Sequence, residues 1–92
     1  MIESITNGLE EKIEDYIGTK AIIMQNGFIE SQYLVNKLNY SMEFEILSIA
    51  DEESTNYLKI NLNQIYNIDK NDNEIIFYLD NDLNITIKKI DQ

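Results

Sequence analysis

Apolar and polar residues follow a helical period near the start of the chain. Leu9, Ile13, Tyr16 and Ile17 recur at the three- and four-residue spacing of a single helix face. Asn7 can cap the first turn, and Gly18 can end the helix because glycine accepts a left-handed backbone. The pattern predicts one short amphipathic helix over residues 7–17.

After residue 19 the pattern changes to the two-residue alternation of half-buried strands. Asn26-Gly27 is a strong signal for a two-residue hairpin turn, and the polar run at 80–82 predicts a second hairpin. The segment 63–69 either extends the strand before it or bends into a short strand of its own. The remaining strands are expected at about 19–25, 28–35, 42–49, 57–62, 74–79 and 83–90.

This order predicts an α+β, mostly β protein: an N-terminal helix followed by an antiparallel meander of five to seven strands, forming a small barrel or a curled sheet. The length of 92 residues favours a single domain over 1–92. The order of helix and then strands resembles Sm-like and other SH3-like small barrels. No functional residue is carried over from that resemblance, because their glycine and Asp/Asn signature has no counterpart at matching positions.

The composition restricts the chemistry. Seventeen acidic and seven basic residues give a net charge of −10, which disfavours direct binding to nucleic acid or an anionic membrane and favours a basic partner. The chain has neither histidine nor cysteine, so the usual zinc ligands and nucleophile-base pairs are missing. No signal peptide or membrane span is recognisable. We therefore expect a cytoplasmic, non-enzymatic protein without a cofactor.

The segment Asp69–Asp80 partly matches a calcium-binding loop. Asp69, Asn71 and Asn73 supply oxygen atoms at alternate positions, but Glu74 stands where the loop needs glycine. The apolar run that follows is typical of a strand rather than of the exiting helix. A solvated hairpin loop is the preferred interpretation, since Asn and Asp accept turn conformations.

The tyrosines are a further candidate binding feature, because aromatic rings can stack on nucleic-acid bases. Base-stacking surfaces normally lie in basic grooves, so we interpret these rings as packing groups in the core or on sheet faces. Those in or beside the predicted strands are Tyr33, Tyr40, Tyr57, Tyr66 and Tyr78.

The acidic clusters carry the main functional hypothesis. On the predicted helix they give roughly one charge per 2 Å, close to the roughly one per 1.7 Å of duplex DNA. In size, acidity and composition the chain resembles small phage-encoded inhibitors of host defence, of the anti-CRISPR or nucleic-acid-mimic type. That resemblance implies a basic nucleic-acid-binding surface as partner. The expected contact residues are Glu10, Glu11, Glu14, Asp15, Glu43, Glu45, Asp51, Glu52 and Glu53.

Three other interpretations remain open at this point. In the first, the acidic residues have no partner and only keep the protein soluble and monomeric. The protein can be a structural or assembly module that acts through a strand edge or an apolar patch. In the third, the protein is a metal-dependent enzyme built on carboxylates. This interpretation predicts that magnesium or calcium stabilises the folded protein.

Overall fold

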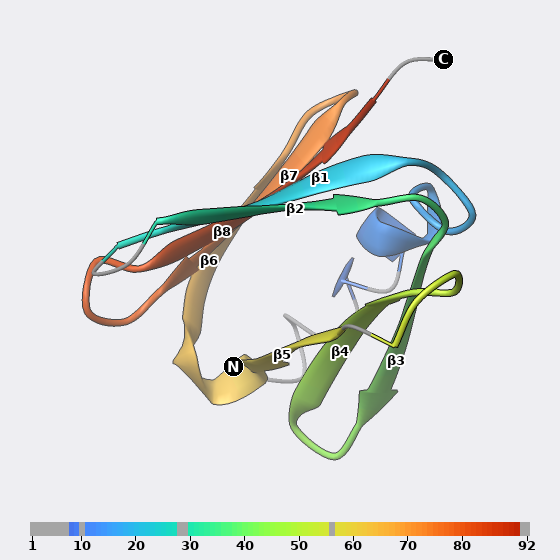
Figure 1. The fold of residues 1–92 in the computed structure, drawn as a ribbon. Coiled ribbons are helices and arrows are strands. Elements are labelled where there is room, and N and C mark those ends of the chain that lie inside the picture. Colours follow the sequence, from blue (N-terminus) through green and yellow to red (C-terminus); the bar gives the residue numbers. More distant parts are fainter. Residues whose placement is uncertain (1–7, 10, 28–29, 56, 91–92) are drawn as a thin grey trace.

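Two antiparallel sheets packed face to face form the body of the molecule (Figure 1). This computed structural model describes residues 8–9, 11–27, 30–55 and 57–90. Within them lie a short N-terminal helix and eight strands. The strands are β1 (Ala21–Asn26), β2 (Ser31–Val35), β3 (Leu38–Glu43), β4 (Ile46–Asp51), β5 (Tyr57–Asn61), β6 (Ile65–Lys70), β7 (Glu74–Leu79) and β8 (Asn84–Lys89).

The larger sheet has the strand order β2-β1-β8-β7-β6, and the smaller one has the order β3-β4-β5. The chain passes between the sheets twice: through residues 36–37 after β2, and through a short 3₁₀ helix, η1 (Leu62–Gln64), after β5. The edges of the larger sheet are therefore β2 and β6, and those of the smaller sheet are β3 and β5.

One hydrophobic core fills the space between the sheets. Alternate residues of each strand point into it, as in β7, where Ile75, Phe77 and Leu79 are buried. The helix adds Leu9 and Ile13, and the turn after it adds Tyr16; all three are fully buried. These residues cover the end of the core beside β8, where Lys89 Nζ lies 4.7 Å from the centre of the Tyr16 ring. Burial also raises the pKa of Tyr16 to about 12.

Several sequence predictions are confirmed. The residues predicted to form strand 74–79 are those of β7, and β8 covers most of 83–90. Residues 63–69 contain a separate short strand, β6, rather than an extension of the strand before it. The turn at 80–82 is a hairpin in which Asn81 and Asp82 have positive φ angles of 66° and 61°, as a type I′ turn requires.

The predicted strand 42–49 was wrong, because it is two strands joined by a turn at Phe44 and Glu45. The alternation of Met42, Phe44 and Ile46 looked like a buried face. In the structure Phe44 has a positive φ of 58° and is 93% exposed. The alternation of apolar and polar residues alone cannot distinguish one long strand from a tight hairpin when the turn residues continue the alternation. This division, together with β6, gives eight strands rather than five to seven.

The two-residue turn predicted at Asn26-Gly27 was also wrong. Gln25 pairs with Ser31, so five residues separate the paired positions, of which 28–29 lie outside the described part. Gly27 instead allows a close approach between turns: its φ is 153°, and an added Cβ would lie 2.7 Å from Leu83 Cδ1. The glycine is needed for packing as well as for the turn.

The helix is shorter than predicted. Residues 8–9 and 11–14 are helical and 15–18 form turns, with Gly18 at a φ of 79° as expected for a helix end. Ile17, expected on the buried face, is 41% exposed because it lies in the turn. Asn7, the predicted cap, lies outside the described residues.

The predicted barrel or curled sheet is not found in the described residues, whose strand pairings divide into two separate sheets. At the two crossings, residues 36–37 and η1, the chain changes sheets instead of continuing the pairing of one meander. Over the described part of the chain, no helix is long and apolar enough to cross a membrane.

Candidate functional site

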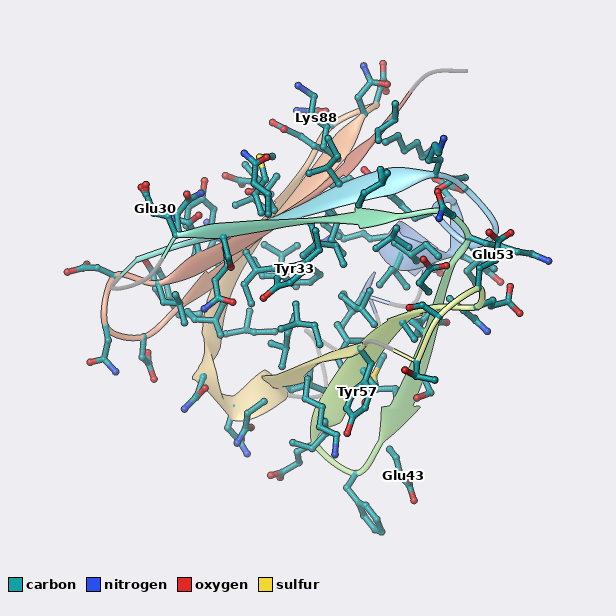
Figure 2. All side chains as sticks on the ribbon, in the orientation of Figure 1. Glu30, Tyr33, Glu43, Glu53, Tyr57 and Lys88 are labelled. Atoms are coloured by element: carbon teal, nitrogen blue, oxygen red, sulfur yellow. The ribbon has the colours of Figure 1, made fainter. Side chains whose placement is uncertain are left out.

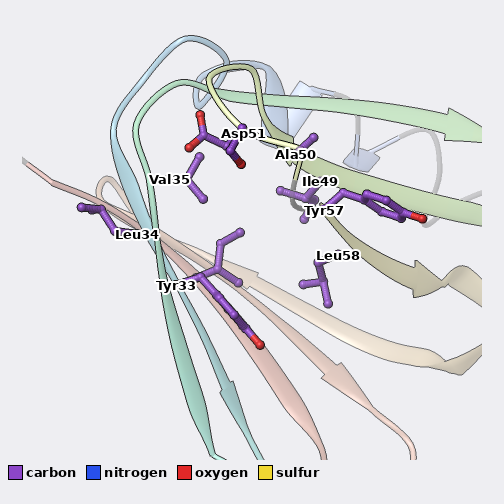
Figure 3. A pocket seen from close by; sticks show the side chains of 10 residues that line it. Tyr33, Leu34, Val35, Ile49, Ala50, Asp51, Tyr57 and Leu58 are labelled. Atoms are coloured by element: carbon purple, nitrogen blue, oxygen red, sulfur yellow. The ribbon is translucent and has the colours of Figure 1, made fainter.

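A cleft of about 290 Å³ opens between the two sheets (Figure 3). Residues of β2 form one wall, and residues of β4 and β5 form the other. Apolar side chains and two tyrosines dominate the lining, with Asp51 at one end. The lining residues are Ile23, Tyr33, Leu34, Val35, Ile49, Ala50, Asp51, Ser54, Tyr57 and Leu58.

The cleft is open because the smaller sheet leaves part of the larger one uncovered. Tyr33 pairs with Ile23, whose side chain is in the core, so Tyr33 lies on the same inner face. Even so, Tyr33 is 55% exposed, and Figure 2 shows it beside the space between the sheets. Leu34 and Tyr57 are 57% and 63% exposed. Leu34 alternates with Tyr33 along β2, and Tyr57 alternates with Leu58 along β5, so Leu34 and Tyr57 lie on the outer faces of the two sheets. Tyr33 is the large exposed side chain on the inner face beside the cleft.

The strand beside this cleft, β2, is an edge strand without the usual protection. Edge strands normally avoid pairing with foreign strands by means of charged residues, proline or bulges. The edge strand β3 has Glu43, β5 has Lys59, and β6 has Lys70 and an irregular register between Ile65 and Asn67. The sequence of β2, SQYLV, contains no charge or proline, and its pairing with β1 is continuous.

Asp51 closes one end of the cleft and holds the surrounding loops. Its carboxylate accepts hydrogen bonds from the backbone N–H groups of Asn36, Lys37 and Glu53, at 3.1, 3.1 and 3.0 Å. Hydrogen bonds to the charged form lower the pKa of Asp51, the bond from Glu53 being the largest cause and burial opposing it. The group is only 7% exposed. It is therefore an ionised, buried carboxylate at the wall of an otherwise apolar cleft.

The acids predicted on the helix have mixed environments. Glu10 lies outside the described residues, and Glu11 and Glu14 are exposed. Asp15 accepts a hydrogen bond from Lys70 Nζ at 2.9 Å, which lowers the pKa of Asp15. This contact ties the end of the helix to β6.

The acids of the loop after β4 lie among lysines. Glu52 is 3.8 Å from Lys37 Nζ. Glu53 lines a shallow hollow together with Lys20 and Lys89. An uninterrupted acidic surface is therefore absent from this described region.

Glu43 and Glu45 lie at the tip of the β3–β4 hairpin, far from the other predicted contact residues. Glu45 is six residues along the chain from Asp51, the last residue of β4, which is roughly 20 Å at about 3.4 Å per residue. Glu45 is also used within the fold, because its backbone carbonyl accepts from Leu62 N–H at 2.8 Å and its carboxylate from Asn63 Nδ2. Glu43 and Glu53 point to different ends of the molecule in Figure 2.

The calcium-loop candidate is a hairpin connection. Asn71 Oδ1 accepts from the backbone N–H groups of Asn73 and Glu74, at 2.9 and 3.0 Å. Asp69 in β6 pairs with Ile76, four residues along the chain from Asp80, roughly 14 Å at about 3.4 Å per residue, so the two acids cannot share one ion. No group of three or more acids suited to a metal ion occurs within the described residues.

Sequence reasoning missed the cleft, although it noted Tyr33 and Tyr57. The available signal was the uncharged run SQYLV, which was interpreted only as part of a hairpin. A sequence does not state which strands become edges, and it does not show where one sheet fails to cover the other. Comparisons with protein-family models, curated proteins and solved structures gave no match.

Proposed function

We propose that the protein is a non-enzymatic protein-binding module, which takes an extended segment of a partner onto the free edge of β2. The observation that supports this most directly is the contrast between β2 and the other three edges, which have charges or a bulge. Adding a strand satisfies the outward backbone groups of the edge, while side-chain pockets provide specificity. The cleft next to β2 is such a pocket.

The partner segment is basic. Glu30 directly precedes β2, and the Asp51 carboxylate binds Asn36, which directly follows it. Acidic groups therefore stand at both ends of an uncharged strand. The net charge of −10 adds a long-range attraction that speeds encounter with a cationic segment.

A selection experiment tests this proposal. Random peptides displayed on phage are selected on the immobilised protein and counter-selected on a Gln32→Lys/Leu34→Lys variant, which places charges on the β2 edge. Both positions are exposed, so the variant should fold, as a thermal unfolding curve can verify. We expect the wild-type protein to select peptides rich in lysine and arginine that the variant does not retain. Peptides retained equally by both proteins would contradict the use of β2.

A second candidate is the inhibitor that occupies a basic nucleic-acid-binding surface of a bacterial defence complex. The observation in its favour is that Glu11, Glu14 and Glu43 are exposed and do not line the cleft. This mode predicts competition with DNA or RNA for the effector, and an affinity that falls steeply as salt rises. Substituting Glu11 and Glu14 by glutamine should then weaken binding more than the Gln32→Lys/Leu34→Lys variant does. The opposite order would favour the β2 edge.

A further inference from the structure

A strand added to β2 would place one of its side chains directly into the cleft. Opposite residues of antiparallel strands point to the same face of the sheet, with Cβ atoms about 4.5–5.5 Å apart. Tyr33 is the middle residue of β2 and lies on the inner face, paired with Ile23. The partner residue opposite Tyr33 therefore points between the sheets, toward the walls formed by β4 and β5.

We infer that this partner residue is lysine or arginine, and that the cleft is a binding site for its cationic side chain. The inference rests on the proposed strand addition at β2. It adds a specificity that strand addition alone does not have, because main-chain pairing does not distinguish between side chains.

The chemistry of the walls matches a long side chain with a charged end. Leu58 and Ile49 offer apolar contact for the methylene stem, which lysine and arginine bury readily while the charged end stays polar. Tyr33 offers a ring on the inner face of β2, and aromatic rings attract a cation electrostatically. Figure 3 shows Tyr33 and Leu58 on opposite walls of the cleft.

The charge inside the cleft is negative. Asp51 is the charged residue among those that line it. Its two oxygens have about four acceptor positions, of which the three backbone N–H groups use three. One acceptor position is left for an incoming ammonium or guanidinium group. A free acid side chain from a partner would be repelled at the same place.

The cleft has room for a long side chain, because its volume of about 290 Å³ lies just below the roughly 300–1,000 Å³ of sites for drug-sized ligands. Lys59 Nζ lies 5.5 Å from the centre of the Tyr57 ring, and both side chains are on the outer face of the smaller sheet, outside the cleft.

A set of matched peptides tests the inference. Each is acetylated and amidated, alternates threonine and valine, has lysine at both ends, and differs only in a central residue: lysine, arginine, norleucine or glutamate. Affinity is measured by fluorescence anisotropy, and amide signals of β2 are followed by NMR. We expect lysine and arginine to bind about tenfold more tightly than norleucine, which has the stem without the charge, and glutamate to bind most weakly.

Tyr33→Leu should reduce this preference while the peptides continue to bind at β2. Tyr57→Leu is the matched control, because Tyr57 is similarly exposed but lies on the outer face of the smaller sheet. Lys59→Met, on the same outer face, should leave the preference intact. Asp51→Asn should reduce the preference in molecules that NMR shows to be folded.

The outcomes separate the two proposals. If norleucine binds as tightly as lysine while the β2 signals shift, the cationic site is wrong and strand addition stands. If the preference survives unchanged in Tyr33→Leu and in folded Asp51→Asn, the cleft is not the place where the cation binds. If no peptide shifts the β2 signals, both the site and the proposed function fail.

Discussion

Asp51 shows how one side chain can organise several segments. It joins the bend after β2 to the loop after β4 through three backbone N–H groups. Its position in the sequence, within an acidic run, indicated a solvent-exposed contact residue. The burial of its carboxylate could not be inferred from that run, since it depends on two loops that meet only in the folded chain.

Acid should destabilise the protein through Asp51. Its pKa in the folded state lies below the ordinary value of 3.8, so the unfolded chain takes up the proton first as the pH falls. The stability contribution is present above the unfolded-state pKa, and is lost as the pH falls below about 4 toward the folded-state pKa. Asp15, whose pKa Lys70 lowers, adds to the same trend.

Urea unfolding at a series of pH values should therefore show a steep loss of stability in acid. Asp51→Asn should flatten that dependence and reduce stability at neutral pH. Glu52→Gln is the control, because an exposed pair such as Glu52 with Lys37 contributes only about 0–1 kcal/mol. An acid dependence unaltered in Asp51→Asn would contradict the assigned role.

Phe44 is a residue that costs the fold stability. A left-handed backbone costs a residue with a side chain about 1–2 kcal/mol, and asparagine accepts it more readily. Because the ring is 93% exposed, little burial offsets that cost. Phe44→Asn should increase the free energy of unfolding by about 1 kcal/mol.

Phe44→Ala separates strain from the loss of the ring, because alanine keeps a Cβ on the same backbone. Its stability should stay close to that of the wild-type protein. Both can be measured by denaturant unfolding. Equal stabilisation by alanine and asparagine would show that backbone strain is not the cause.

At the scale of elements, local alternation predicted most strands but not their partners. β7 and β8 were recognisable because strong apolar alternation coincides with a clear turn at 80–82. The β3–β4 hairpin was hidden because its turn contains Phe44, an aromatic residue that rarely has a positive φ. The assignment of β2 as an edge depends on β8 pairing with β1, a contact between distant parts of the chain.

The β1–β2 and β7–β8 turns should be energetically coupled. Gly27→Ala introduces a strained backbone, and a Cβ that would lie 2.7 Å from Leu83 Cδ1. We expect it to cost about 1 kcal/mol or more in the wild-type background. In a Leu83→Ala background the clash with Cδ1 disappears, while the backbone strain and a tight contact of 3.3 Å with the Cα of residue 83 remain.

A double-mutant cycle measured by denaturant unfolding can separate these parts. A coupling energy of about 0.5 kcal/mol or more is expected, as for residues in direct contact. Additive effects within experimental error would mean that the two turns do not pack together in solution.

At the scale of the whole molecule, net charge acts over distances comparable with the protein itself. The molecule measures 35 × 28 × 26 Å, and the Debye length falls from about 30 Å at 10 mM salt to about 8 Å at 150 mM. At low salt the acids repel one another across the whole fold. Raising salt over this range should therefore increase thermal stability.

A charge-reduced variant provides the control for that prediction. Glu30→Gln combined with Asp80→Asn changes two exposed acids and should weaken the salt dependence. A decrease in melting temperature with salt in the wild-type protein would show that the described ion pairs outweigh the overall repulsion.

Amide hydrogen exchange with and without a saturating lysine-centred peptide tests the central claim most directly. Strand addition at β2 predicts slower exchange for outward-facing amides within Ser31–Val35. Exchange at the edges of β3, β5 and β6 should not change. Protection at one of those edges, or unchanged exchange throughout β2 while the peptide is bound, would contradict the claim that β2 and its cleft form the binding site.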